Sequence, residues 1–175
     1  DSDYVALAQR MKRLGRYIVA VGVAGATSRS LPAACNEFCL YDDLPGVDAE
    51  RIASMGFCFG GGHSLLLGLR QSENIPLTII YYGDVITDVN LLEPLMDSQG
   101  VLGVFAEEDQ QIFVGDVVEF ESALNTLDIP NEITIYPGVG HAFLNEENFD
   151  QPGPAGEAWQ QTVAFLARNF KDERP

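Results

Sequence analysis

Near the middle of the chain the sequence reads Gly56-Phe57-Cys58-Phe59-Gly60-Gly61. A cysteine with glycine two positions before it and two after it is typical of a nucleophile elbow, a sharp turn from a strand into a helix. The turn strains the backbone of its central residue, and the glycines let strand and helix approach without Cβ clashes. The hexapeptide therefore predicts an α/β fold that holds Cys58 out at the carboxyl end of a sheet.

The segments on either side of the hexapeptide fit this prediction. Residues 51–55 form an apolar run of strand length, and the leucine-rich residues 63–70 are typical of a helix that packs on a sheet. Residues 60–62 are three successive glycines, each costing a helix about 1 kcal/mol relative to alanine. We therefore expect this helix to pass very close to neighbouring strands. The alternative is a buried structural cysteine in a glycine-rich turn.

Cys58 also has the setting of a reactive thiol. At a helix N-terminus the dipole and the free backbone N–H groups favour the thiolate over the thiol. The same N–H groups can stabilise an oxyanion that forms on a substrate. We therefore expect Cys58 to be a nucleophile with a lowered pKa.

The rest of the chain alternates between helical and strand patterns. Helices are expected at 4–14, 89–96, 114–127 and 156–170, and strands at 17–21, 76–82, 101–106 and 133–136. Such alternation predicts a parallel sheet with helices on both faces, whose functional residues follow the carboxyl ends of strands. Two further cysteines, Cys35 and Cys39, have helical spacing within 31–41 and are expected to be small core residues.

Two residues that follow predicted strands complete a catalytic set. Asp109 ends the polar loop after 101–106, and His141 lies in the turn after 133–136. In a Cys-His-Asp set the imidazole takes the thiol proton and later returns it to the leaving group, while the carboxylate fixes the imidazole tautomer. The chain order, nucleophile then acid then base, is the one found in α/β-hydrolases.

Other assignments remain open for these positions. His141 could simply cap a turn, Asp109 could be solvated, and Asp84, after the strand at 76–82, could serve as the acid instead. The second histidine, His63, lies inside the helix that follows the elbow and is expected to face a neighbouring loop.

Composition limits the classes of function. The 175 residues are 46% hydrophobic, enough for one domain over 1–175, and no apolar run approaches the roughly 20 residues of a membrane span. With 10 basic and 26 acidic residues the net charge is −16, which disfavours nucleic acid and anionic lipid as partners. The three cysteines lack metal-site spacing, so no metal is expected, and a reducing cytoplasm is the expected location.

Taken together, the motifs resemble the dienelactone hydrolase family of the α/β-hydrolase fold. The matching segments, in chain order, are residues 48–61, Tyr82-Gly83, the loop that ends in Asp109, residues 136–143, and the closing helix with Ala158-Trp159. The resemblance implies a three-layer fold with a mostly parallel central sheet. It implies Cys58 as nucleophile, His141 as base and Asp109 as acid. It places the backbone N–H of Phe59 in the oxyanion hole, Tyr82 and Phe143 near the substrate, and implies no cofactor.

The chain also departs from the family pattern. The N-terminal strands, and the loop that supplies a second oxyanion donor, are expected to be missing, which would leave an incomplete domain with an exposed sheet edge suited to a homodimer. Residues 22–45 do not match the pattern. After His141 the chain has Leu144-Asn145 where an arginine would hold an anionic lactone. A neutral ester, lactone or thioester is therefore the expected substrate.

Three functions are compatible with the sequence. The first is a cysteine hydrolase that acts through an acyl-enzyme. The second is a non-catalytic binding relative that has lost the oxyanion loop, and the third is a redox or acyl-carrying role for Cys58. The acidic loop at 146–154 is expected to be a solvated connection or a lid over the site.

Overall fold

The computed structural model describes residues 2–13, 19–22, 30–40 and 51–170. The chain divides into two compact units, Asp1–Glu50 and Arg51–Pro175. The elements of the first unit are α1 (Ser2–Arg13), β1 (Val19–Gly22), α2 (Ser30–Ala34) and β2 (Glu37–Leu40). Strands β1 and β2 pair in parallel, and a small core forms around Ala8, Ala34 and Cys35.

The first unit corrects one expectation from the sequence. The helical spacing of Cys35 and Cys39 does not correspond to one helix, because α2 ends at Ala34 and Cys39 lies in β2. Pairing of Glu37–Leu40 with β1 overrides the helical spacing of the two cysteines. Cys35 is buried and Cys39 half-buried, and both thiols are free. The end of the helix expected at 4–14 and the start of the strand expected at 17–21 lie outside the described residues.

The second unit carries the predicted parallel sheet. Its elements are β3 (Ala53–Phe57), α3 (Phe59–Gln71), β4 (Leu77–Tyr81), α4 (Val89–Leu92), the 3-10 helix η2 (Glu93–Asp97), β5 (Gly100–Ala106), α5 (Val114–Thr126), β6 (Asn131–Tyr136) and α6 (Pro154–Asn169). The strand order is β3-β4-β5-β6, and every pairing is parallel. The α/β fold predicted from the elbow and the alternating pattern is thus confirmed.

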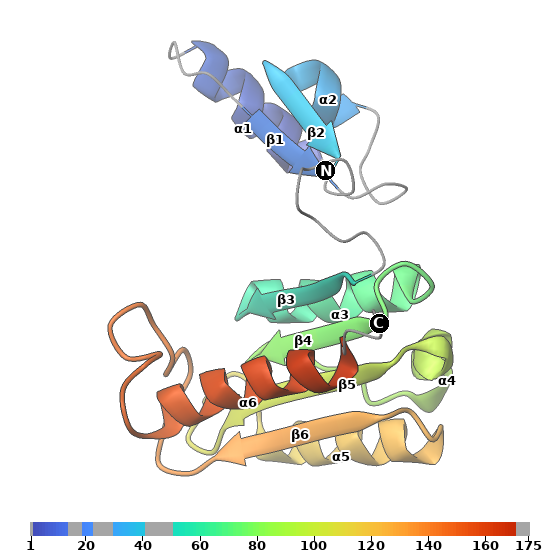
Figure 1. Cartoon of the computed structure of the whole chain (residues 1–175), viewed down its shortest axis with the longest axis vertical. Helices are drawn as coiled ribbons and strands as arrows, with labels where there is room; N and C mark the ends of the chain where they lie inside the picture. The colour runs from blue at the N-terminus through green and yellow to red at the C-terminus, as the bar shows by residue number, and fades with distance from the viewer. Residues whose placement is uncertain (1, 14–18, 23–29, 41–50, 171–175) are drawn as a thin grey trace, which may run out of the picture. The chain divides into compact units, whose positions relative to one another are not determined.

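Helices cover both faces of this sheet, as Figure 1 shows: α6 crosses one face, while α3 and α5 lie on the other. Side chains alternate between the faces along each strand. Ile80 joins the cluster under α3 and α5, whereas Ile79 and Tyr81 join the cluster under α6. The carboxyl ends of the parallel strands therefore lie along one edge of the sheet, and helices cover both faces of that sheet.

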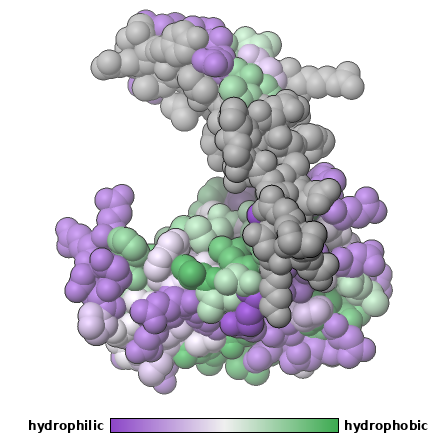
Figure 2. All heavy atoms as spheres, in the orientation of Figure 1, coloured by the Kyte–Doolittle hydropathy of each residue, from purple (hydrophilic) through white to green (hydrophobic). Residues whose placement is uncertain are grey.

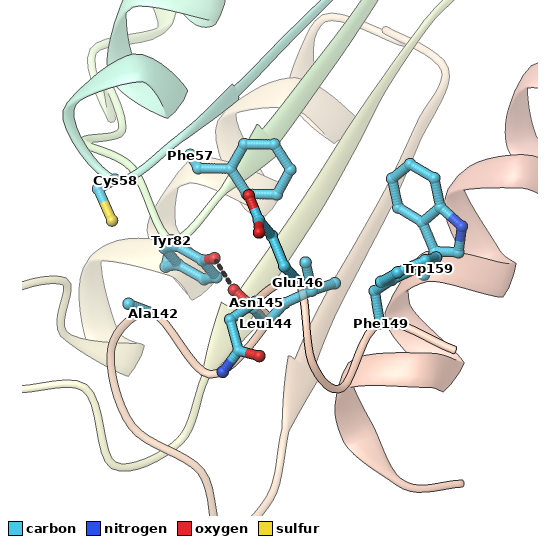
Figure 3. Close-up of a pocket in the computed structure, with 9 residues that line it drawn as sticks. All are labelled: Phe57, Cys58, Tyr82, Ala142, Leu144, Asn145, Glu146, Phe149 and Trp159. Carbon is cyan, nitrogen blue, oxygen red and sulfur yellow. Dashed lines mark hydrogen bonds between the residues drawn. The ribbon is translucent and has the colours of Figure 1, made fainter. Parts of the chain in front are cut away.

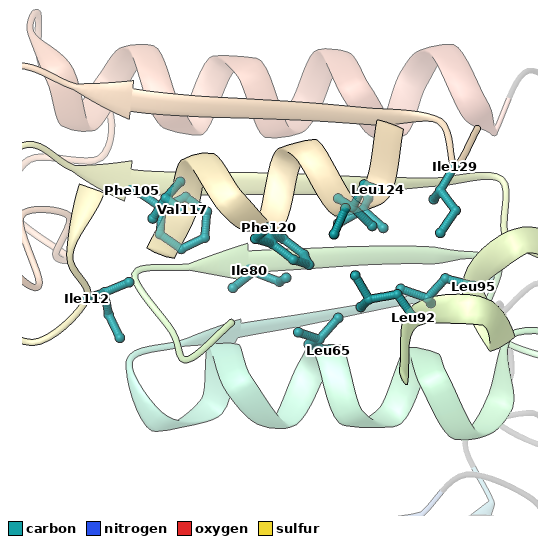
Figure 4. Close-up of a cluster of buried hydrophobic side chains, with 12 residues drawn as sticks. Leu65, Ile80, Leu92, Leu95, Phe105, Ile112, Val117, Phe120, Leu124 and Ile129 are labelled. Carbon is teal, nitrogen blue, oxygen red and sulfur yellow. The ribbon is translucent and has the colours of Figure 1, made fainter. Parts of the chain in front are cut away.

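The larger core lies between the sheet and helices α3, α4 and α5 (Figure 4). Its buried residues are Leu65, Ile80, Leu92, Leu95, Val101, Phe105, Ile112, Val117, Phe120, Ala123, Leu124 and Ile129. On the opposite face the Tyr81 hydroxyl ties α6 to β4, because it donates to the Ala158 carbonyl at 3.0 Å and lies 2.6 Å from Thr162 Oγ1. These contacts fix β4, the strand that Tyr82 directly follows.

Polar residues form much of the surface of the second unit that is in view in Figure 2, with hydrophobic patches between them. None of the helices in the described part of the chain has the length and apolar character needed to span a bilayer.

Candidate active site

The turn at Cys58 has the geometry predicted from the hexapeptide. Cys58 directly follows β3 and precedes α3, with φ 52° and ψ −124°. This positive φ is uncommon for a residue with a Cβ. The turn is held by the Cys58 N–H, which donates to the Tyr81 carbonyl at 3.0 Å, and by the Cys58 carbonyl, which accepts from the Gly61 N–H at 2.9 Å. Neighbouring strand and helix backbone thus enforce the strained angles.

Two of the nearby glycines are required by space. A Cβ on Gly56 would overlap the Gly60 carbonyl, and one on Gly61 would lie 2.9 Å from the Tyr81 carbonyl oxygen. The predicted close approach of helix and strands is therefore confirmed at these positions. A Cβ on Gly60 would meet nothing within 4 Å, so the second flanking glycine of the motif is not needed for space.

The electrostatic setting of Cys58 differs from the sequence expectation. Burial raises the pKa of the Cys58 thiol, and the Asp109 carboxylate raises it further. This direction is opposite to the lowering expected from the helix N-terminus, because loss of solvation and a nearby negative charge both disfavour the thiolate. At neutral pH the resting side chain is a thiol.

His141 and Asp109 lie in contact. Nδ1 of His141 is 2.8 Å from Oδ2 of Asp109. Since an ionised carboxylate only accepts, Nδ1 carries the hydrogen and the neutral imidazole has its lone pair on Nε2. The structure thus brings together the two residues that the sequence singled out from separate loops.

Asp109 is fixed by its own loop. The residue is 5% exposed, and Oδ1 accepts from the backbone N–H groups of Gln111 at 2.8 Å and Ile112 at 3.1 Å. Burial alone would raise the pKa of Asp109, but the hydrogen bonds from Gln111, His141 and Ile112 outweigh it and lower the pKa. The carboxylate is therefore held ionised beside the imidazole.

Tyr82 lies against both Cys58 and His141. Its ring centroid is 5.3 Å from that of His141, its φ is 36°, and its hydroxyl donates to the Leu144 carbonyl at 3.2 Å. Burial, with a smaller contribution from Cys58, raises the pKa of Tyr82 to about 12. Phe143 packs edge-on against the Tyr82 ring at 5.6 Å. Tyr82 therefore braces the loop that carries His141.

A cavity of about 600 Å³ opens beside Cys58 (Figure 3). The described residues that line it are Phe57, Cys58, Tyr82, Ala142, Leu144, Asn145, Glu146, Phe149 and Trp159. Cys58, Tyr82 and Ala142 all have positive φ, and backbone strain of this kind clusters at functional sites. The cavity is therefore the candidate binding site of the second unit.

The remaining predicted residues fall in different places. The Phe59 side chain is 75% exposed, and its backbone N–H stands at the first position of α3, where N–H groups have no intrahelical acceptor. Phe143 packs behind Tyr82 and is not among the described residues that line the cavity.

Asp84 is exposed, and the described partner of His141 is Asp109. His63 bonds the Phe59 carbonyl at 2.9 Å and, as expected, faces the loop at 84–86.

Sequence reasoning missed most of the cavity wall. Phe57, Leu144, Phe149 and Trp159 line it, and so does Glu146, which is exposed and belongs to the loop expected to be a solvated connection or a lid over the site. The apolar Phe149 within that acidic loop is the signal that could have indicated packing. No group of three or more His, Cys, Asp or Glu residues that could hold a metal exists among the described residues.

Comparison with known proteins tests the family resemblance separately from the structure. Residues 19–170 match the model described as "Dienelactone hydrolase family". The chain is 34% identical over 135 residues to the "Putative carboxymethylenebutenolidase" of Saccharolobus solfataricus, which covers 75% of this chain and 49% of that protein. It is 27% identical over 129 residues to the carboxymethylenebutenolidase of Rhodococcus opacus, covering 69% of this chain and 51% of that protein. The chain thus spans about half the length of the curated relatives it matches.

A solved structure shows the same fold. The crystal structure of a "Putative Dienelactone Hydrolase" from Klebsiella pneumoniae superposes with a TM-score of 0.59 at 26% identity, over 71% of this chain and 55% of that one. The resemblance inferred from the elbow and the two loops is confirmed by these matches.

Proposed function

Because the chain belongs to the dienelactone hydrolase family, we propose that it hydrolyses small ester, lactone or thioester bonds with Cys58 as the nucleophile. The observation that carries the proposal is the contact between His141 and Asp109 beside the cavity that Cys58 lines. A thiol, an imidazole with its lone pair on Nε2 and an ionised carboxylate have the chemical roles that acyl transfer requires.

The first half of the reaction forms an acyl-enzyme. His141 Nε2 removes the thiol proton, and the sulfur attacks the carbonyl carbon to give a tetrahedral oxyanion. The Phe59 N–H donates to that oxyanion, because it lies at the free end of α3 next to the nucleophile. The imidazolium then protonates the leaving alcohol or thiol as its bond to the carbonyl carbon breaks.

The second half releases the acid. A water molecule enters in place of the alcohol, loses a proton to His141 Nε2 and attacks the thioester carbon. Collapse of this intermediate breaks the carbon–sulfur bond and returns the proton to sulfur, so the enzyme regains a neutral thiol. The raised pKa of Cys58 suits this cycle, because the thiolate need exist only while His141 holds its proton.

The same pKa argues against the redox alternative. Cysteines that act as redox sensors have lowered pKa values and are reactive as thiolates at neutral pH. Burial and the Asp109 carboxylate instead raise the pKa of Cys58. A general-base mechanism accounts for both the raised pKa and the neighbouring imidazole.

The cavity favours a neutral or cationic substrate over an anionic lactone. Its described lining is mostly apolar and includes the carboxylate of Glu146, but no lysine, arginine or histidine. An anionic group would have no described partner there, and the net charge of −16 would repel it.

The experiment is hydrolysis of p-nitrophenyl acetate by the full 175-residue chain. Cys58→Ala and His141→Ala are each expected to reduce kcat/KM at least about 100-fold. Cys39→Ala and His63→Ala are the matched controls, because they remove a cysteine and a histidine that do not line the cavity. Equal activity in all five proteins would overturn the proposal, and an inert wild type would favour a non-catalytic binding relative.

A further inference from the structure

The cavity beside Cys58 combines aromatic walls with one acidic group. Four of the described residues that line it are aromatic, namely Phe57, Tyr82, Phe149 and Trp159, and one is a carboxylate, Glu146. The acyl transfer proposed above does not require Phe57, Phe149, Trp159 or Glu146. Their side chains therefore bear on which substrate the cavity binds.

The aromatic residues form two pairs from different parts of the unit. Phe57 at the end of β3 lies 6.2 Å from Tyr82 between ring centroids, at an interplanar angle of 51°. Phe149 lies 5.8 Å from Trp159 of α6, at 83°. Figure 3 shows the Glu146 side chain between these two pairs. Ring faces and edges at several orientations thus surround the cavity together with a carboxylate.

This arrangement of aromatic rings and a carboxylate favours a cation over a neutral or anionic group. The faces of aromatic rings attract cations, most strongly when the cation is shielded from water. A carboxylate beside the cation adds Coulomb attraction, which water partly screens because Glu146 is exposed. A neutral acyl chain would gain nothing from Glu146 and would need to cover or avoid a charged group. An anion would be repelled.

We propose that this cavity binds the cationic group of an ester that carries a tertiary or quaternary ammonium, and that Glu146 determines this specificity. The inference rests on the proposed function, since it names the substrate class of the same site. The cation takes no part in bond making. Water and the ester give an acid and an alcohol through the Cys58 acyl-enzyme, and the ammonium leaves unchanged on whichever product carries it.

Pairs of substrates that differ only in charge test the inference. The first pair is the p-nitrophenyl ester of 4-(trimethylammonio)butyrate and that of its carbon isostere, 5,5-dimethylhexanoate. The second pair places the charge on the alcohol and consists of acetylcholine and 3,3-dimethylbutyl acetate. Within each pair the shape is the same, so the ratio of kcat/KM values reports the recognition of charge.

Glu146→Gln removes the charge at the cavity, and Glu147→Gln is its matched control. Glu147 is the next residue in the same loop and is exposed, as Glu146 is, but it is absent from the described lining. The two variants have the same net charge, so a difference between them cannot come from the overall field of the protein.

In at least one pair, wild type and Glu147→Gln should prefer the cationic ester by about tenfold, and Glu146→Gln should reduce that preference to about twofold. Equal kcat/KM values for both members of both pairs, with turnover of p-nitrophenyl acetate intact, would overturn the inference and leave the proposed function standing. A preference that Glu146→Gln leaves unchanged would also overturn it. Failure to turn over any of the esters would instead contradict the proposed function.

Discussion

Nδ1 of His141 lies 2.8 Å from Oδ2 of Asp109, although 32 positions separate the two residues. The register of β5 and β6 explains this contact, because Ala106 and Tyr136 are paired at the carboxyl ends of the two strands. The pairing continues into the loops, where the N–H groups of Glu107 and Glu108 donate to the carbonyls of Tyr136 and Val139 at 2.9 Å each. Two loops that begin in register thus present acid and base to each other.

Loss of the Asp109 carboxylate should reduce catalysis while the fold remains. In Asp109→Asn the amide oxygen keeps the Gln111 and Ile112 N–H groups, so the amide NH2 group faces His141 and donates to Nδ1. The imidazole hydrogen then moves to Nε2 and the base is lost. We expect kcat/KM for p-nitrophenyl acetate to fall by about 10²- to 10⁴-fold. Glu108→Gln, in the same loop and exposed, is the control and should stay within about twofold of wild type. Equal rates for Asp109→Asn and wild type would contradict a role for the pair.

The same carboxylate should contribute to stability above its unfolded pKa. The pKa of Asp109 is lower in the folded than in the unfolded chain, so folding favours the ionised form. The contribution is complete above the unfolded value and is lost as the pH falls from there through the folded value. Urea unfolding between about pH 6 and pH 2 should show a steeper loss in wild type than in Asp109→Asn. Parallel curves for the two proteins would rule out this coupling.

The Cys58 thiol should be slow to alkylate at neutral pH. Burial and the Asp109 charge raise its pKa, and only the thiolate reacts with iodoacetamide. We expect the modification rate of the peptide that contains residue 58, followed by mass spectrometry, to keep rising through the alkaline range. The rate at neutral pH should increase in Asp109→Asn, where the negative charge is gone. A rate that levels off below pH 7 in wild type would show a lowered pKa instead.

Two glycines of the elbow should differ in their tolerance of a methyl group. Gly56→Ala places a Cβ against the Gly60 carbonyl and should lower the free energy of unfolding by about 1–3 kcal/mol or more. Gly60→Ala meets open space within α3 and should be neutral or stabilising by up to about 1 kcal/mol. Chemical denaturation of both variants compares them directly, and equal destabilisation would be inconsistent with the close contact at Gly56.

Features set by local chemistry could be predicted from the sequence. The elbow needs a glycine at position 56 because the strand and helix backbones meet there, and the alternation of apolar runs fixes the order of strands and helices. Asp109 and His141 could be identified because both follow core strands. The structure adds the direct contact between them, which depends on β5 and β6 being neighbours.

Features set by packing between distant segments could not be predicted. The acidic loop with Glu146 and Phe149 was expected to be a solvated connection or a lid over the site, but only the fold shows that these two residues line the same cavity as Phe57 and Trp159. The thiol pKa also escaped prediction, because the desolvation of Cys58 and the position of Asp109 are tertiary effects. The strand that contains Cys39 could not be predicted either, because the pairing of β2 with β1 has no signal in the spacing of two cysteines.

The most direct test of the account is pre-steady-state hydrolysis of p-nitrophenyl acetate by the 175-residue chain. A covalent mechanism predicts a burst of p-nitrophenol stoichiometric with protein, followed by turnover, with an acetyl group on Cys58 in acid-quenched samples. Cys58→Ala should abolish the burst and the label. Turnover without a burst or label in wild type, unchanged in Cys58→Ala, would contradict Cys58 as the nucleophile.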